Sequence, residues 1–143
     1  MNIQELQTIV HYAIPLKIFV YNNKGYISIQ QTQNNLFEGR QVASSELSGV
    51  SCPDIIKIAK AYGIHTEQIR TNSEINTKLK KVFKYDGPVI CEVVLSPKMQ
   101  FIPKAASMQL KDGSFISRPI EDMYPFLARE ELQATMLIPL WEE

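Results

Sequence analysis

An apolar run that stops at two asparagines constrains the fold of this chain more than any other feature. Residues 18–21, Ile-Phe-Val-Tyr, have the pattern of a short buried strand, and Asn22, Asn23, Lys24 and Gly25 follow directly. In open α/β sheets, ligands bind outside the carboxyl ends of the strands. Amides and a glycine-relaxed loop at such a place can offer oxygens to a hard cation and backbone N–H groups to a phosphate. The segment therefore predicts an α/β fold with a polar site beyond this strand.

Helical and extended patterns alternate along the first hundred residues. In order, the sequence predicts a helix at 3–12, a strand at 16–21 covered on both faces, a short helix and loop at 25–37, a surface loop at 38–49, a helix from Pro53 to Gly63, a strand at 65–70, a helix from Ser73 to Lys84 and a strand at 89–95. Strands that alternate with helices favour a parallel sheet with helices on both faces, a three-layer α/β architecture.

Local signals support these boundaries. Ser51 and Asp54 have the spacing of a capping box at the start of the helix that Pro53 opens, and Gly63 is expected just past its end. Ser73 is expected to cap the next helix. Cys91 lies inside an apolar strand pattern and is expected to be a small core residue.

The pattern changes after Pro97. Residues 98–143 contain four prolines and little periodicity, apart from a hairpin expected to turn at Asp112-Gly113 and a short helix expected at 130–137. We therefore divide the chain into an α/β domain at 1–97 and an irregular C-terminal tail at 98–143. The tail either belongs to the same domain or wraps a neighbouring surface.

Composition argues against several classes of protein. The chain has 143 residues, with 15 basic and 15 acidic side chains, so no net field favours nucleic acid or an anionic membrane. No apolar run reaches the length of a membrane span, and no signal peptide is visible. Two cysteines far apart in the sequence suggest a reduced, cytoplasmic setting. His11 and His65 have no ligand partner at metal-binding spacing.

Three segments carry a family resemblance. Met1 to Gly25, M-N-I-Q-E-L-Q-T-I-V-H-Y-A-I-P-L-K-I-F-V-Y-N-N-K-G, resembles the second half of the cofactor motif of thiamine diphosphate enzymes, in the acetolactate synthase-like branch. The similarity continues through residues 53–63 and 87–93, P-D-I-I-K-I-A-K-A-Y-G and G-P-V-I-C-E-V. It covers about the first two thirds of the chain.

The resemblance implies a set of site residues. Mg²⁺ would be bound by the side-chain oxygen of Asn23 and the backbone carbonyl of Gly25. The wider cofactor site would comprise Met1, Asn22, Asn23, Gly25, Tyr26, Ile27 and Ser28. The substrate would be contacted by Gln30 and Thr32. The family's Asp ligand, in a G-D-G segment, would lie about four positions before Met1. Asp112-Gly113-Ser114 imitates that segment, but it follows the asparagines and is expected to be only a turn.

The implied activity is that of a longer parent enzyme with thiamine diphosphate and Mg²⁺ as cofactors. Such an enzyme decarboxylates a 2-oxo acid such as pyruvate and transfers the acyl carbanion to an acceptor. Acetolactate synthases carry a Trp near the Thr32 position, so this chain departs from the pattern on the acceptor side. Acetolactate synthesis, acyl transfer to a ketosugar and simple decarboxylation all stay open.

The same resemblance predicts the partners. This chain would be an N-terminally truncated cofactor domain that needs the remaining domains of its parent, forms a homo-oligomer and is inactive alone. Two alternatives stay open, each from a different class of protein. One is a non-catalytic assembly or regulatory module that docks through the proline-rich tail, and the other is a small phosphate-binding protein unrelated to thiamine.

Overall fold

The computed structural model describes residues 2–109 and 112–139, and Met1 lies outside them. The chain forms two compact units, one up to Met99 and one from Gln100 onward, and each is described by itself.

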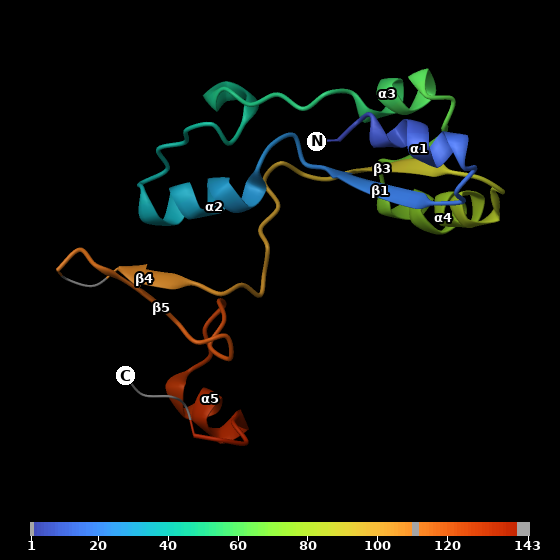
Figure 1. Cartoon of the computed structure of the whole chain (residues 1–143). Helices are drawn as coiled ribbons and strands as arrows, with labels where there is room; N and C mark the ends of the chain where they lie inside the picture. Colours follow the sequence, from blue (N-terminus) through green and yellow to red (C-terminus); the bar gives the residue numbers. More distant parts are fainter. Residues whose placement is uncertain (1, 110–111, 140–143) are drawn as a thin grey trace. The chain divides into compact units, whose positions relative to one another are not determined.

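A parallel sheet forms the centre of the first unit. Its strands are β1 (Lys17–Asn22), β2 (His65–Ile69) and β3 (Val89–Val94). Their order is β1-β3-β2, so β3 is central and pairs in parallel with both neighbours (Figure 1). The predicted strands and their parallel arrangement are therefore confirmed. The carboxyl ends of all three strands lie at the same edge of the sheet, where the two asparagines follow β1.

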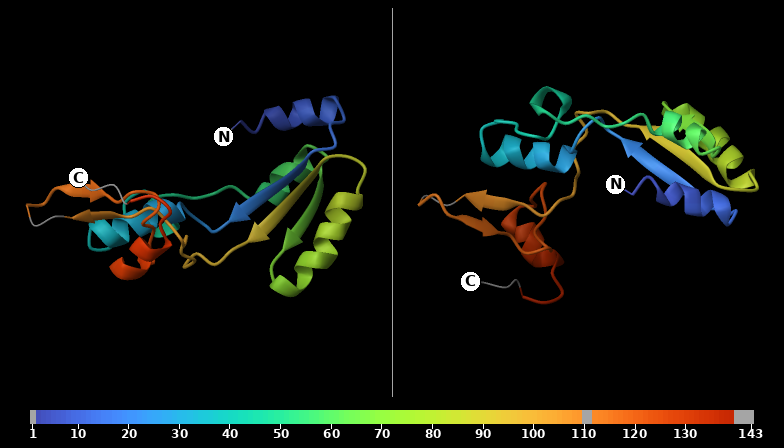
Figure 2. Two further views of the ribbon diagram at one scale, coloured as in Figure 1. Left: turned by 90° about the horizontal axis from the view of Figure 1, so that it is seen from below. Right: turned by 45° about the horizontal axis from the view of Figure 1, so that its top comes forward.

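Helices cover both faces of this sheet, as predicted. The helices of the first unit are α1 (Glu5–His11), α2 (Ile27–Leu36), α3 (Ile55–Ala61) and α4 (Ile75–Lys84), with 3-10 turns η1 (Glu46–Ser48) and η2 (Asn72–Glu74), and α1, α3 and α4 are the ones that cover the sheet. The helices α1 and α3 lie on one face and α4 on the other (Figures 1 and 2). The segment from α2 to η1 extends beyond the carboxyl ends of the strands.

Two small cores hold the layers together. On the α4 side, Val82 and Cys91 are fully buried. The rest of that core comprises Ile69 and Val89, with Phe19, Leu79 and Val93 packed against it. Burial raises the pKa of the Cys91 thiol, as expected of an inert core cysteine. On the other face, Ala59, Ile64 and Ile90 pack with Leu6, Val10, Ile18, Val20, Ile55 and Tyr62.

Several local predictions need correction. The helix α3 begins at Ile55 because the Asp54 carboxylate accepts a hydrogen bond from the backbone N–H of Lys57, so Asp54 is the cap and Ser51 is not. The helix α4 follows η2, whose start is capped reciprocally by Thr71 and Glu74 rather than by Ser73.

The strand β1 is covered on both faces, as predicted, since Phe19 packs against the α4-side core and Ile18 and Val20 pack against the core on the other face. Among the described strands it pairs with β3 alone, so it lies at an edge of the sheet, and Tyr21 near its end is 69% exposed. One prediction about solvent contact needs correction. The 38–49 segment is not only a surface loop, since it contains η1 and the fully buried Ser44.

The second unit is built around one buried carboxylate. The strands β4 (Ser107–Gln109) and β5 (Phe115–Ser117) pair antiparallel, which confirms the predicted hairpin, and α5 (Arg129–Thr135) lies close to the predicted 130–137 helix. Asp122 is 4% exposed and accepts hydrogen bonds from Arg118 and Arg129. Among the described residues, no helix is long and apolar enough to cross a membrane.

Candidate functional site

A tight polar turn follows β1 at the carboxyl edge of the sheet. The Asn22 side-chain oxygen accepts a hydrogen bond from the Lys24 N–H at 3.1 Å. The Asn23 oxygen lies 3.3 Å from the Gly25 nitrogen, a longer contact. Lys24 has a positive φ of 58°, a conformation that such turns demand. The two asparagines therefore end the strand by bonding their own backbone, and they gather two amide oxygens in one turn.

Gly25 is held from the other side by Ser44. The Ser44 carbonyl accepts hydrogen bonds from the Tyr26 N–H at 2.8 Å and from Gln30 Nε2 at 2.7 Å. A Cβ at Gly25 would lie 2.6 Å from both the Ser44 oxygen and Gln30 Nε2. The close approach of the Ser44 backbone therefore requires glycine at position 25. The sequence did not predict the role of Ser44, because a serine within a polar segment has no distinguishing pattern.

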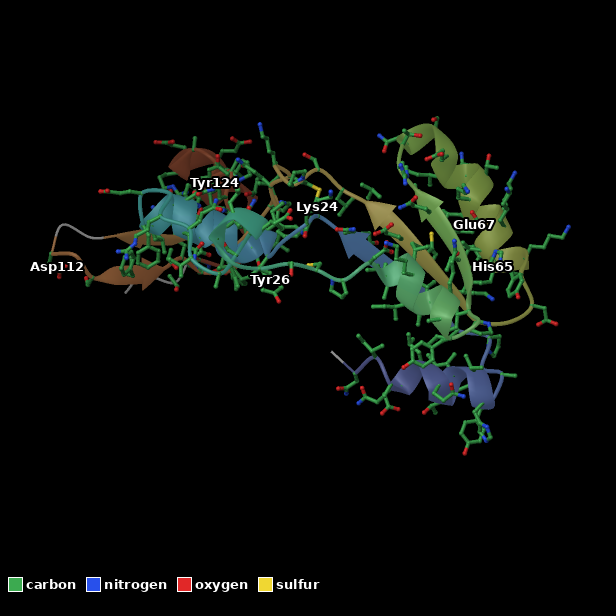
Figure 3. The ribbon with its side chains drawn as sticks, turned by 90° about the horizontal axis from the view of Figure 1, so that it is seen from above. Lys24, Tyr26, His65, Glu67, Asp112 and Tyr124 are labelled. Carbon is green, nitrogen blue, oxygen red and sulfur yellow. The ribbon has the colours of Figure 1, made fainter. Side chains whose placement is uncertain are left out.

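The helix α2 begins directly after this turn. Ile27 is buried, whereas Tyr26 and Ser28 are exposed (Tyr26 is labelled in Figure 3). Because the first N–H groups of a helix have no acceptor within it, this end of α2 can donate hydrogen bonds to an anion. Thr32 lies one turn further on and is exposed, with its hydroxyl bonded to the Ser28 carbonyl at 3.2 Å.

A buried carboxylate lies beneath the turn. Glu92, in the central strand, is 6% exposed and accepts hydrogen bonds from the side-chain amides of Asn22, at 2.6 Å, and Gln68. Gln68 in turn accepts a hydrogen bond from Arg70 Nε at 2.7 Å. Sequence reasoning missed this network, although a Glu inside an apolar strand is itself a signal that the side chain needs partners.

These groups border a cavity of about 720 Å³ within the first unit. The cavity extends from the ends of the strands to the segment that precedes α3. Its lining comprises Asn22, Lys24, Glu46, Val50, Ser51, Cys52, Pro53, Asp54, Ile56, Lys57, Lys60, Gln68, Arg70, Glu92 and Val94.

The structure brings most of the expected site residues together. Asn22, Asn23 and Gly25 share the turn, and Tyr26, Ile27 and Ser28 continue from it into α2. Gln30 is engaged with the Ser44 carbonyl. Met1 lies outside the described residues. Asp112 and Gly113 belong to the second unit, where the Asp112 carboxylate accepts hydrogen bonds from Ser114, as expected of a turn.

The turn can hold a hard cation by the chemistry of its donors. The Asn23 amide and the Gly25 carbonyl provide neutral oxygens of the kind that Mg²⁺ binds in proteins. Among the residues that the structure describes, no group of three or more His, Cys, Asp or Glu side chains could hold a metal ion. A cation at this turn would therefore rest on amide and carbonyl oxygens rather than on a cluster of acidic side chains of the described residues.

Comparison with known proteins agrees with this geometry. Residues 1–93 match the family model described as thiamine pyrophosphate enzyme, C-terminal TPP binding domain. The chain is 36% identical over 110 residues to a probable acetolactate synthase large subunit from Methanococcus aeolicus, covering 76% of this chain and 18% of that protein. It is 31% identical over 106 residues to the mitochondrial acetolactate synthase catalytic subunit of Saccharomyces cerevisiae, covering 74% of this chain and 15% of that protein.

A third relative is more distant. The acetolactate synthase large subunit of Cyanidium caldarium is 28% identical over 106 residues, which covers 74% of this chain and 18% of that protein. The chain thus spans less than a fifth of the length of these relatives. The residues matched by the family model include β1, β2, all of β3 except Val94, the Asn22–Gly25 turn and the whole of α2. This chain belongs to the thiamine pyrophosphate enzymes and is related to the TPP-binding domain of acetolactate synthase-like members.

Proposed function

We propose that this chain supplies the diphosphate- and Mg²⁺-binding part of an acetolactate synthase-like enzyme. That enzyme decarboxylates a 2-oxo acid such as pyruvate and transfers the acyl unit to an acceptor. The observation that best supports the proposal is the Asn22–Gly25 turn, which gathers hard oxygen ligands at the carboxyl edge of a parallel sheet. When bound, thiamine diphosphate supplies the carbon nucleophile and the electron sink that this chemistry needs.

Each residue of the turn has a separate part in this proposal. Asn23 and the Gly25 carbonyl bind the metal ion, while the N–H groups of Ile27 and Ser28, in the first turn of α2, face the diphosphate, with Tyr26 beside them. Ser44 keeps the Gly25 backbone in place through the Tyr26 N–H. In this proposal the chain binds and orients the cofactor, and the groups that move protons belong to other parts of the enzyme.

The substrate side is less closely tied to the turn. Gln30 and Thr32 lie on α2, beyond the turn, and we retain both as candidates for contact with the substrate. Because Gln30 Nε2 donates one of its two N–H groups to the Ser44 carbonyl, the second N–H and the side-chain oxygen are left for such a contact. Thr32 is exposed. The remaining domains of the enzyme and a second subunit complete the site in this proposal.

Paramagnetic NMR of the whole 143-residue chain tests the metal site. Mn²⁺ replaces Mg²⁺ at oxygen sites and broadens nearby resonances, so weak binding is visible without any activity. In the presence of thiamine diphosphate, we expect selective broadening of the Asn23, Lys24, Gly25 and Tyr26 amides. Asn23→Ala should remove most of it, whereas Asn76→Ala, at an exposed position of α4, should not. Uniform broadening, or an unchanged pattern in Asn23→Ala, would refute the proposed metal site.

A non-catalytic docking role is the second candidate, and a feature of the second unit favours it. Within one short segment of this unit, Ile120 is 74% exposed and Tyr124, Phe126 and Leu127 are each more than 40% exposed, and exposed apolar side chains gathered in this way are typical of a docking surface. In this case residues 118–127, R-P-I-E-D-M-Y-P-F-L, would bind a partner protein. Absence of any selective Mn²⁺ effect on the unmodified chain would favour this role.

A further inference from the structure

Glu92 is the buried acidic side chain of the central strand, and neither of its partners is a cation. Its Oε1 accepts from Asn22 Nδ2 at 2.6 Å, and its Oε2 accepts from Gln68 Nε2. Asn22 ends β1, and Gln68 lies opposite Glu92 on β2. Burying a carboxylate is costly unless hydrogen bonds compensate. The hydrogen bonds of Glu92 connect all three strands at the edge of the sheet where the turn lies. This costly arrangement indicates a role for Glu92 beyond packing.

The orientation of the Asn22 amide supplies one. Both carboxylate oxygens of Glu92 accept hydrogen bonds from side-chain amides, so the NH₂ group of Asn22 faces Glu92. The oxygen of Asn22 then faces the opposite way, where it accepts the Lys24 N–H at 3.1 Å. If the Asn22 amide turned over, Lys24 would face an NH₂ group and this bond would be lost. Glu92 thus determines whether the Asn22 side chain can hold the turn.

We infer that Glu92 is a positioning residue for the metal-binding turn, acting on Asn23 and Gly25 through the Asn22 amide. The effect on metal binding rests on the proposed function. The effect of Glu92 on the hydrogen bond of the Lys24 N–H does not depend on that function.

The second arm of the network provides a matched control. Gln68 contacts the other oxygen of Glu92 and continues to Arg70, away from the turn. Gln68→Met removes that arm but leaves the bond between Glu92 and Asn22. Glu92→Met removes the acceptors of both arms at nearly the same volume. If the network has a purely structural role, both variants should lose Mn²⁺ affinity in proportion to their loss of stability. If Glu92 positions the turn, only Glu92→Met should lose the Lys24 hydrogen bond and the Mn²⁺ affinity.

NMR of the whole chain separates these outcomes. In the unmodified chain, we expect a downfield Asn22 side-chain N–H resonance and a slowed solvent exchange of the Lys24 amide. Glu92→Met should abolish the resonance and speed that exchange about tenfold, the effect of losing one ordinary hydrogen bond. The Mn²⁺ affinity in the presence of thiamine diphosphate should fall about 10- to 100-fold, as for other residues that support metal ligands. Gln68→Met should leave the resonance and the affinity near their original values.

A pair of milder substitutions keeps the test decisive if Glu92→Met does not fold. Asn22→Asp places two carboxylates face to face and should free the Lys24 amide. Adding Glu92→Gln should restore its protection, because the amide introduced on β3 can donate to the carboxylate introduced on β1 and still accept from Gln68. Failure of this double variant to restore Lys24 protection, or unchanged Lys24 exchange in a folded Glu92→Met chain, would overturn the positioning role. If Mn²⁺ has no selective effect on the unmodified chain, the proposed function fails while the Lys24 exchange result still judges the role of Glu92.

Discussion

The guanidinium of Arg129 binds the carboxylate of Asp122 with two parallel hydrogen bonds, Nη1 to Oδ2 at 2.7 Å and Nη2 to Oδ1 at 2.8 Å. Arg118 Nη1 adds a third bond to Oδ2 at 2.6 Å. Such bidentate, charge-assisted bonds are among the stronger polar interactions in proteins. The Arg129 bonds, followed by those of Arg118, lower the pKa of Asp122 from 3.8 to about 2. This ion cluster joins the segment before α5 to the start of that helix.

Acid should therefore loosen the second unit at a definite pH. Because the folded-state pKa of Asp122 lies below its unfolded value, its contribution is present above about pH 4 and is lost as the pH falls toward 2. We expect Asp122→Asn to lower the stability of this unit by about 1–2 kcal/mol at neutral pH, a value reduced for the exposure of the arginines. Urea unfolding followed through the Tyr124 and Phe126 ring resonances measures it. Glu121→Gln, at an exposed neighbour, is the control, and equal stability of the two variants would contradict the prediction.

Gly25→Ala should displace the segment around Ser44. Its new Cβ would lie 2.6 Å from the Ser44 backbone oxygen, which cannot move aside as a side chain can. We expect a loss of about 1–3 kcal/mol in stability, the usual range for overpacking. Thermal unfolding measures the loss. Gln30→Ala in the same chain should not rescue it, because the clash with the Ser44 backbone persists. Full rescue would mean that the Gln30 side chain is the only obstacle.

Val82→Ala should weaken the core on the α4 side of the sheet. Val82 is fully buried against Ile69, Val89 and Cys91, and the substitution removes two methyl groups. We expect a cost of about 2 kcal/mol from lost burial and the cavity left behind. Thr77→Ala, at an exposed position of the same helix, should change stability by less than about 0.5 kcal/mol. Chemical denaturation of both variants measures the contrast, and similar midpoints would show that α4 does not pack on the sheet as described.

The chain by itself should bind thiamine diphosphate weakly. Its turn provides two protein oxygens, from Asn23 and Gly25, whereas Mg²⁺ prefers six ligands in a nearly octahedral arrangement. We expect calorimetry to show dissociation constants for thiamine diphosphate well above the micromolar range. Binding this weak is the reason for using Mn²⁺ broadening to detect the metal site. Tight, Mg²⁺-dependent binding would mean that the chain completes the site without further domains.

The free edge of β1 should make the chain self-associate. Among the strands that the structure describes, β1 pairs with β3 alone, and an edge strand offers unpaired N–H and C=O groups to another chain. Tyr21, at 69% exposure, adds apolar area to that edge. We expect sedimentation velocity to show a dimer that builds up with concentration, and Tyr21→Lys to weaken it, because a charge on an edge strand opposes pairing. A concentration-independent monomer would show that the edge is not a site of association.

The amino-acid sequence alone determined the α/β class, the parallel strands and the turn after β1. The apolar runs at 18–21 and 89–95 are short but almost uninterrupted, and the Asn-Asn-Lys-Gly segment that follows the first of them is rich in residues that favour turns. The cap of α3 is Asp54 and not Ser51, because both residues are of a type that caps helices and only the Asp54 carboxylate reaches the Lys57 N–H.

Only the tertiary structure decided what supports the turn. Ser44 and Glu92 lie 19 and 67 residues after Gly25 in the chain, and no local pattern links them to it. Their contacts exist because the segment around η1 folds back on Gly25 and because β3 inserts between β1 and β2. Strand order is set by burial of the whole sheet rather than by any one segment, so the partner of Asn22 had to come from the folded chain.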